Sequence, residues 1–213
     1  MRRLRCLLLT SLLAAGCGPI VAGSGKVITE SRNVSGFSAV SLDGSGRLVI
    51  EQTGSESLTV TGDDNLLPYI ETYVSGKTLT LGEKSGTNIS PSKDIVFRLT
   101  VKSLDNIDIS GSGAADVKGV QGHALKVGIS GSGEVSAEGA EDELNIGISG
   151  SGRYRGDTLR TKQARVDISG SGSALLAVSA KLDANVSGSG TIEYVGDPQV
   201  HQDISGSGSV RKR

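Results

Sequence analysis

The stretch Ile146-Gly147-Ile148-Ser149-Gly150-Ser151-Gly152 contains the pattern that decides the fold of this chain. Its last four residues form a Ser-Gly-Ser-Gly motif that recurs at spacings of 20, 19, 20, 18 and 18 residues, beginning at Ser110, Ser130, Ser149, Ser169, Ser187 and Ser205. A degenerate earlier copy is Asp43-Gly44-Ser45-Gly46. Near-regular self-similarity on this scale is typical of proteins built from stacked repeats.

The residues before each copy alternate between apolar and polar types, which predicts a β-strand with one buried face. The position directly before the first serine is always β-branched: Ile109, Ile129, Ile148, Ile168, Val186 and Ile204. The position two before that serine is polar or glycine: Asp108, Gly128, Gly147, Asp167, Asn185 and Asp203. If each repeat is one coil, the β-branched residues stack into a continuous core.

A unit of this length cannot bury an apolar face alone, so successive units must stack on one another. We therefore predict an all-β fold, a single-stranded right-handed parallel β-helix (β-solenoid) with about 18–20 residues per coil. The motif glycines would supply positive φ and close backbone approach at a corner of each coil. Further strands are expected in the first half, at residues 37–42, 48–50, 58–60, 79–81 and 95–101, with a projecting loop at 83–94.

The N-terminus resembles a bacterial lipoprotein signal. Arg2, Arg3 and Arg5 precede an apolar stretch that is too short to span a bilayer, and Ala14-Ala15-Gly16-Cys17 follows it. Small residues directly before a cysteine resemble a lipobox, in which Cys17 would be lipidated. Leucine is usual where Ala14 stands, and the alternative is an ordinary signal peptide cut nearby.

This signal divides the chain into a signal peptide at residues 1–16, a tether at 17–31 and a β-helix domain at 32–213. Removing the signal peptide also removes Cys6, which leaves Cys17 as the one remaining cysteine and excludes a disulfide within the mature chain. We expect a lipid-anchored protein of the bacterial cell envelope, at the outer membrane, on its periplasmic or surface face.

Charge and composition argue against several classes of partner. The signal peptide holds three of the 22 basic residues and none of the 23 acidic ones, so the mature chain has 19 against 23, a net charge of −4. A mildly acidic chain with few aromatics is a poor nucleic-acid binder.

Gly23-Ser24-Gly25-Lys26 lacks the spacing of a phosphate loop. His123 and His201 fall about four coils apart, too far to share a metal. We expect no cofactor, no metal site and a monomer.

One outward cluster is a candidate ligand-binding site. The positions four and two residues before the last three motifs would stack onto one patch, formed by Arg165, Asp167, Asp183, Asn185, His201 and Asp203. Parallel β-helix enzymes that act on polysaccharides use carboxylate and basic groups on an outer face. The simpler interpretation is a solvated strand face that keeps the solenoid soluble. The patch has no aromatic platform of the kind that carbohydrate sites usually offer.

The chain also resembles a known family, the bacterial putative auto-transporter adhesin head domain, or head GIN domain, whose function is unknown. The resemblance rests on the Ser-Gly-Ser-Gly repeats and on two earlier segments, Arg32–Val40 and Val60–Thr72, the latter followed by Val74 and Gly76–Leu79. It covers about residues 32–210 and implies a parallel β-helix in the cell envelope. It implies little about activity, since fold alone does not settle function.

Three functions remain open on this basis. The leading hypothesis is a non-enzymatic envelope lipoprotein, an adhesin-like binding or structural module that contacts envelope polysaccharide or protein. The alternative is a polysaccharide-active β-helix enzyme, a lyase or hydrolase, that uses the outer-face patch; no residue is assigned as catalytic. A third is recognition of a repetitive polymeric or crystalline ligand by the serine ladder itself.

Overall fold

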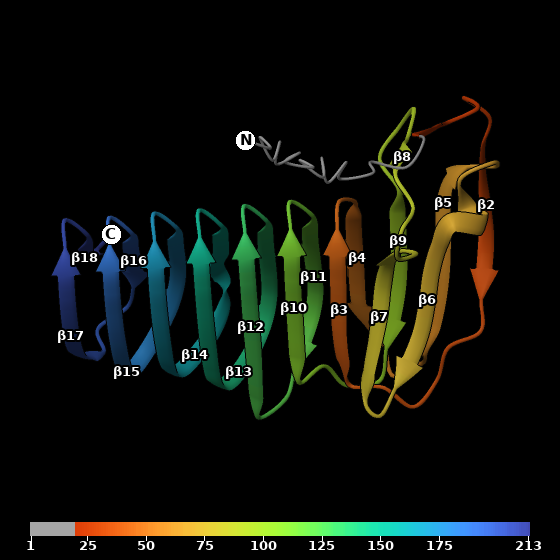
Figure 1. Cartoon of the computed structure of the whole chain (residues 1–213). Helices are drawn as coiled ribbons and strands as arrows, with labels where there is room; N and C mark the ends of the chain where they lie inside the picture. Colours follow the sequence, from red (N-terminus) through yellow and green to blue (C-terminus); the bar gives the residue numbers. More distant parts are fainter. Residues whose placement is uncertain (1–19) are drawn as a thin grey trace, which may run out of the picture.

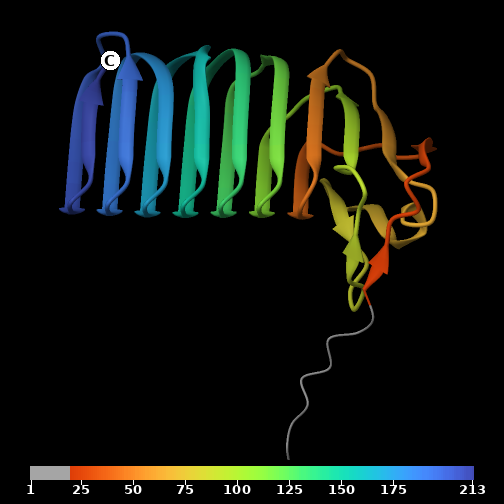
Figure 2. The ribbon, with the colours of Figure 1, turned by 90° about the horizontal axis from the view of Figure 1, so that it is seen from above.

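The computed structural model describes residues 20–213, which form an elongated stack of β-coils with an irregular N-terminal end (Figures 1 and 2). Each coil contributes one strand segment to each of two parallel ladders, so the chain is a two-sided β-solenoid. Within these residues no helix is long and apolar enough to cross a membrane. The predicted fold class is confirmed.

We call the ladder that leads into the Ser-Gly-Ser-Gly motifs the motif face, and the ladder that follows them the opposite face. The motif face contains β3 (Ala39–Gly44), β10 (Asn106–Gly111), β12 (Ala124–Gly131), the second halves of β13 (Glu134–Gly150), β14 (Arg153–Gly170) and β15 (Ser173–Gly188), and β17 (Gln199–Gly206). The opposite face contains β4 (Arg47–Gln52), β11 (Ala114–Gln121), the first halves of β13 to β15, β16 (Thr191–Val195) and β18 (Ser209–Lys212).

The core lies between the two faces and consists of stacked inward side chains. Ile129, Ile148 and Ile168 are in register on successive coils, and each is at most 2% exposed. The polar neighbours of Ile148, such as Asn145, point outward and are exposed. The alternation read from the sequence therefore separates core from surface as expected, because strand side chains alternate between the two faces.

The motif makes the corner between the two faces with backbone contacts. The amide of Ser151 donates a hydrogen bond to the carbonyl of Gly131 at 2.8 Å, and the amide of Arg153 donates to the carbonyl of Gly133 at 2.9 Å. The same two contacts recur from coil to coil. Gly150 has φ of 111°, and an added Cβ would lie 2.6 Å from the Gly131 carbonyl oxygen. Glycine is required here because a side chain would separate the stacked backbones.

The N-terminal end departs from the expected series of parallel coils. β7 (Thr78–Glu83) and β9 (Val96–Val101) extend the two faces beyond β3 and β4 with parallel pairing, although they follow them in sequence. β6 (Ile70–Ser75), β5 (Ser57–Asp63) and β2 (Val27–Arg32) then pair antiparallel and close this end. The remaining elements are η1 (Leu67–Tyr69) and the small pair of β1 (Val21–Ala22) with β8 (Ile89–Ser90).

This cap corrects two details of the sequence interpretation. The strands expected in the first half are present, but the antiparallel pairing of β2, β5 and β6 means that residues 32–103 are not a simple run of parallel coils. Alternation predicts a strand but not its direction, and no motif copy fixes the path between β4 and β10. β1 and β2 also place residues 21–22 and 27–31 in paired strands of the cap, within the segment 17–31 where a tether was expected. The projecting segment at 83–94 is present, with β8 within it.

Asp63 holds the cap together. Its buried carboxylate accepts hydrogen bonds from the Ser92 hydroxyl at 2.6 Å, the Ser92 amide at 2.8 Å and the Gly25 amide at 2.8 Å. These bonds, the Ser92 hydroxyl first, lower the pKa of Asp63 despite its burial. One side chain on β5 thus fixes both the segment before β2 and the segment after β8.

Candidate functional site

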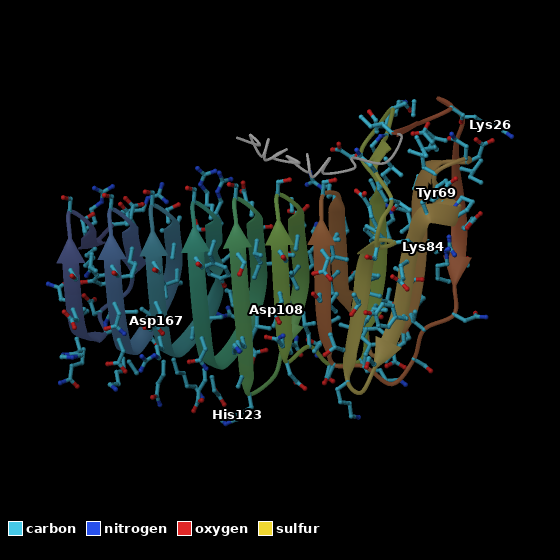
Figure 3. The ribbon with its side chains drawn as sticks, in the orientation of Figure 1. Lys26, Tyr69, Lys84, Asp108, His123 and Asp167 are labelled. Atoms are coloured by element: carbon cyan, nitrogen blue, oxygen red, sulfur yellow. The ribbon has the colours of Figure 1, made fainter. Side chains whose placement is uncertain are left out.

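The structure brings together the six residues that the sequence predicted as one patch. Arg165, Asp183 and His201 occupy the same register position on three successive coils of the motif face, and so do Asp167, Asn185 and Asp203. We call this set the Arg165–Asp203 patch. Asp167 marks its place on the ribbon in Figure 3. The two histidines lie on separate coils, as expected: His123 precedes β12, whereas His201 lies on β17.

Asp167 is the most constrained member of the patch. Its Oδ2 accepts a hydrogen bond from Arg165 Nε at 2.9 Å, and its Oδ1 accepts one from Asn185 Nδ2 at 2.6 Å. Partial burial raises its pKa, but the bonds from Arg165 and Asn185 outweigh that effect and the pKa is lowered. The same contact raises the pKa of Arg165. Asp167 is therefore an ionised carboxylate at neutral pH, with a hydrogen-bond donor on each oxygen.

Asp183 is held in a similar state by a residue that sequence reasoning did not include. Lys181 Nζ lies 2.7 Å from Asp183 Oδ2, and this hydrogen bond lowers the pKa of Asp183. His201 and Asp203 lie on the last motif-face strand and are exposed. The patch thus contains two carboxylates in ion pairs and two side chains open to solvent.

A shallow hollow of about 270 Å³ lies within the patch, lined by Asp167, Asn185 and Asp203 together with motif serines such as Ser187. Lys181, Arg165 and Asp183 border a second hollow of about 200 Å³ beside it. These surfaces offer carboxylate, amide, hydroxyl and guanidinium groups at hydrogen-bonding positions. Such an arrangement suits a hydroxyl-rich or charged ligand that lies across the coils.

Neither Asp167 nor Asp183 is held in the protonated state that a general acid requires near neutral pH. A general acid has to keep its proton near neutral pH, which requires a raised pKa, and both Asp167 and Asp183 have lowered values. Among residues 20–213 no group of three or more histidine, cysteine or acidic side chains could hold a metal ion.

Sequence reasoning missed a second polar cluster in the same row of the motif face. Asp108 occupies the register position of Asp167 three coils earlier, and Asn106 Nδ2 contacts its carboxylate. Gly128 and Gly147 occupy the two register positions between these aspartates, both of which are labelled in Figure 3. The repeat alignment contained this signal, because it places all four residues two positions before a motif.

Sequence reasoning also missed Glu141, a buried carboxyl beside a cleft at the edge where the chain passes from the opposite face to the motif face. Because its neighbours Asp142 and Glu143 are also acidic, the sequence pattern of this segment is typical of a solvent-exposed segment. The predicted lipidation site, Cys17, lies outside the described residues.

Comparisons with known proteins agree with this architecture. A family model described as "Putative auto-transporter adhesin, head GIN domain" matches residues 36–198. A solved structure of a putative adhesin from Bacteroides fragilis is similar at a TM-score of 0.75 and 22% identity, covering 91% of this chain and 100% of that chain. A search of curated protein sequences finds no match.

Two further solved structures share the fold. A putative lipid binding protein from Parabacteroides distasonis has a TM-score of 0.62 at 24% identity, and a putative adhesin from Parabacteroides merdae has 0.58 at 22%; each comparison covers 92% of this chain and 100% of that chain. At these identities the likeness concerns the fold alone. The family model spans most of the sequence, including five of the six Ser-Gly-Ser-Gly copies, and the chain therefore belongs to the putative auto-transporter adhesin, head GIN domain family.

Proposed function

We propose that this protein is a non-enzymatic, adhesin-like lipoprotein that binds a hydroxyl-rich or charged envelope polymer through the motif face. Family membership indicates an envelope or surface-associated protein. The observation that carries the proposal is the Arg165–Asp203 patch, in which three coils present ionised and amide groups around a shallow hollow. A polymer aligned across the coils could contact several of these groups at once.

The chemistry of the patch suggests a polysaccharide or an extended polar segment of an envelope protein. Carboxylate, amide and guanidinium groups donate to and accept from hydroxyls, and hydrogen bonds that involve charged groups are stronger than neutral ones. The patch has no aromatic platform, so each contact contributes modestly. We expect affinity to come from repeated contacts along a polymer rather than from one sugar.

A polysaccharide lyase or hydrolase remains the alternative, and one assay separates the two. The mature domain is incubated with neutral and acidic polysaccharides from envelope extracts, and both the retained polymer and soluble products are measured. We expect retention of intact polymer. Release of new reducing ends or unsaturated uronate products would replace the binding proposal with an enzymatic one.

The lipid anchor is a separate part of the proposal and rests on the segment from Arg2 to Cys17. Changing Cys17 to serine removes the thiol to which a lipid would be attached. We expect Cys17→Ser to abolish labelling by a palmitate analogue and to release the protein from membranes into the soluble fraction. Unchanged labelling and membrane partitioning of the variant would refute the anchor.

A further inference from the structure

The edge opposite the motif corner contains a feature that the proposed function does not use. Here the chain passes from the opposite face to the motif face, and a cleft of about 590 Å³ runs along five successive coils. Gly122 and Glu141 line it, together with Thr161 and Val178 of the following coils. His123, beside Gly122, marks this edge in Figure 3.

Glu141 is an acid without a partner. The residue is 4% exposed, and both of its carboxyl oxygens are buried without a hydrogen bond. Gly122 covers the carboxyl from the preceding coil: an added Cβ there would lie 2.9 Å from Oε1 and 3.2 Å from Oε2. Thr161 is next to Glu141 in register, but its hydroxyl contacts the Leu159 carbonyl at 3.4 Å. An ionised carboxylate in such a place loses hydration without compensation.

The charges around Glu141 also disfavour ionisation. Burial raises its pKa most, Asp142 and Asp105 raise it further, and His123 opposes them; the result is a pKa of about 7. Lys162 faces the same edge but pairs with Asp142 Oδ1 at 2.6 Å. Arg160 lies on the rim of the cleft and is exposed. Within residues 20–213, no lysine or arginine side chain acts on the Glu141 carboxyl to lower its pKa.

The turn that covers Glu141, residues 121–124, is held at both ends by hydrogen bonds. The side chain of Gln52 exchanges hydrogen bonds of 2.9 and 3.1 Å with the backbone of Gln121, and the amide of Glu143 donates to the His123 carbonyl at 2.9 Å. His123 Nδ1 lies 3.2 Å from Asp142 Oδ2, a contact that becomes an ion pair when the imidazole is protonated. Gly122, between these anchors, is exposed. A small displacement of this turn would admit water to Glu141.

We propose that residues 121–124 form a proton-operated latch over Glu141, closed while the carboxyl is protonated and opened by its ionisation. Opening extends the cleft at its Gly122 end and exposes a carboxylate there. The latch is independent of the Arg165–Asp203 patch and does not depend on the proposed function.

The sign of the pH dependence follows from the two states of Glu141. In the closed turn the carboxyl stays protonated up to a pKa of about 7, whereas in the open turn it ionises near its ordinary value of 4.5. Opening therefore becomes more favourable as pH rises from 4.5 to 7 and levels off above that. With full rehydration, the opening constant would rise by roughly fiftyfold between about pH 5 and about pH 8.

Amide hydrogen exchange of residues 121–124 measures this constant, after correction for the intrinsic pH dependence of exchange. We expect the rise of roughly fiftyfold in the unmodified protein and a change below about threefold in Glu141→Gln, whose side chain cannot ionise. Glu143→Gln removes an exposed carboxylate on the same strand and is expected to keep the full dependence. A wild-type protein without this rise, or a Glu141→Gln variant that retains it, overturns the latch.

A direct titration keeps the proposal testable if Glu141→Gln fails to fold. The carboxyl carbon of Glu141 is followed by NMR in the unmodified protein, together with the Gly122 amide. A carboxyl midpoint near 7, shared by the Gly122 amide, supports the latch. A midpoint below about 5, or a Gly122 amide that does not follow the carboxyl, contradicts it.

Discussion

Replacing Ile148 by aspartate is expected to unfold the domain or to lower its stability by several kcal/mol, because the new carboxylate would lie in the core without a partner. Ile148 is 2% exposed and stacks between Ile129 and Ile168. The added charge would also disrupt the apolar column on both neighbouring coils. Chemical denaturation followed by circular dichroism measures the loss.

The matched control introduces the same side chain three residues earlier. Asn145 is on the same strand but points outward, beside Arg165 of the next coil. Asn145→Asp is expected to change stability by less than about 0.5 kcal/mol. Equal losses in the two variants would show that the division into inward and outward positions is wrong.

Adding a single methyl group at Gly150 is expected to cost about 2 kcal/mol or more, because the residue has φ of 111° and the new Cβ would lie 2.6 Å from the Gly131 carbonyl oxygen. That oxygen accepts the Ser151 amide, so relief of the clash would break the ladder at the corner. The loss should appear as a lower midpoint in thermal unfolding of Gly150→Ala.

Gly147 provides the control for this substitution. It lies on the same strand, and an added Cβ there meets nothing within 4 Å. Gly147→Ala is expected to leave stability unchanged or to raise it by up to about 1 kcal/mol, since alanine restricts the unfolded chain. Similar losses at both positions would mean that the corner does not need glycine.

The repeat and its register could be predicted from the sequence because each coil of the repeat region contains its own copy of the Ser-Gly-Ser-Gly motif. The β-branched residue before every motif marks an inward position, and the glycines within the motif mark the corner of the coil. Stacking of similar coils then sets the register between them. The same alignment placed the Arg165–Asp203 patch on one face. The ion pair between Lys181 and Asp183 could not be predicted in this way, because it depends on which way two long side chains lean.

The cap and the latch lay beyond sequence reasoning for different physical reasons. Between β4 and β10 no motif sets the coil boundary, so alternation indicated strands such as β5 but not their antiparallel pairing. Along β13 the buried residues Val135, Ala137 and Glu141 share one parity, whereas the later buried residues Leu144, Ile146 and Ile148 share the other. The phase of alternation therefore changes just after Glu141, and alternation counted back from the motif places this acid outward. Buried polar groups of this kind follow from packing in three dimensions.

The polysaccharide retention assay, performed with two matched variants, tests the central claim that the motif face binds the envelope ligand. One variant removes three acids of the patch by alanine substitution: Asp167, Asp183 and Asp203. The other removes three acids of the opposite face, each of which has a cationic partner: Asp116, Glu134 and Glu193. Both lose the same charge.

We expect the patch variant to retain polymer at least about tenfold less well, since loss of one or two charge-assisted hydrogen bonds is enough for that change. The opposite-face variant should stay within about twofold of the unmodified domain, and the polymer should be recovered intact in every case. Undiminished retention by a folded patch variant, or an equal loss in both variants, would contradict the account.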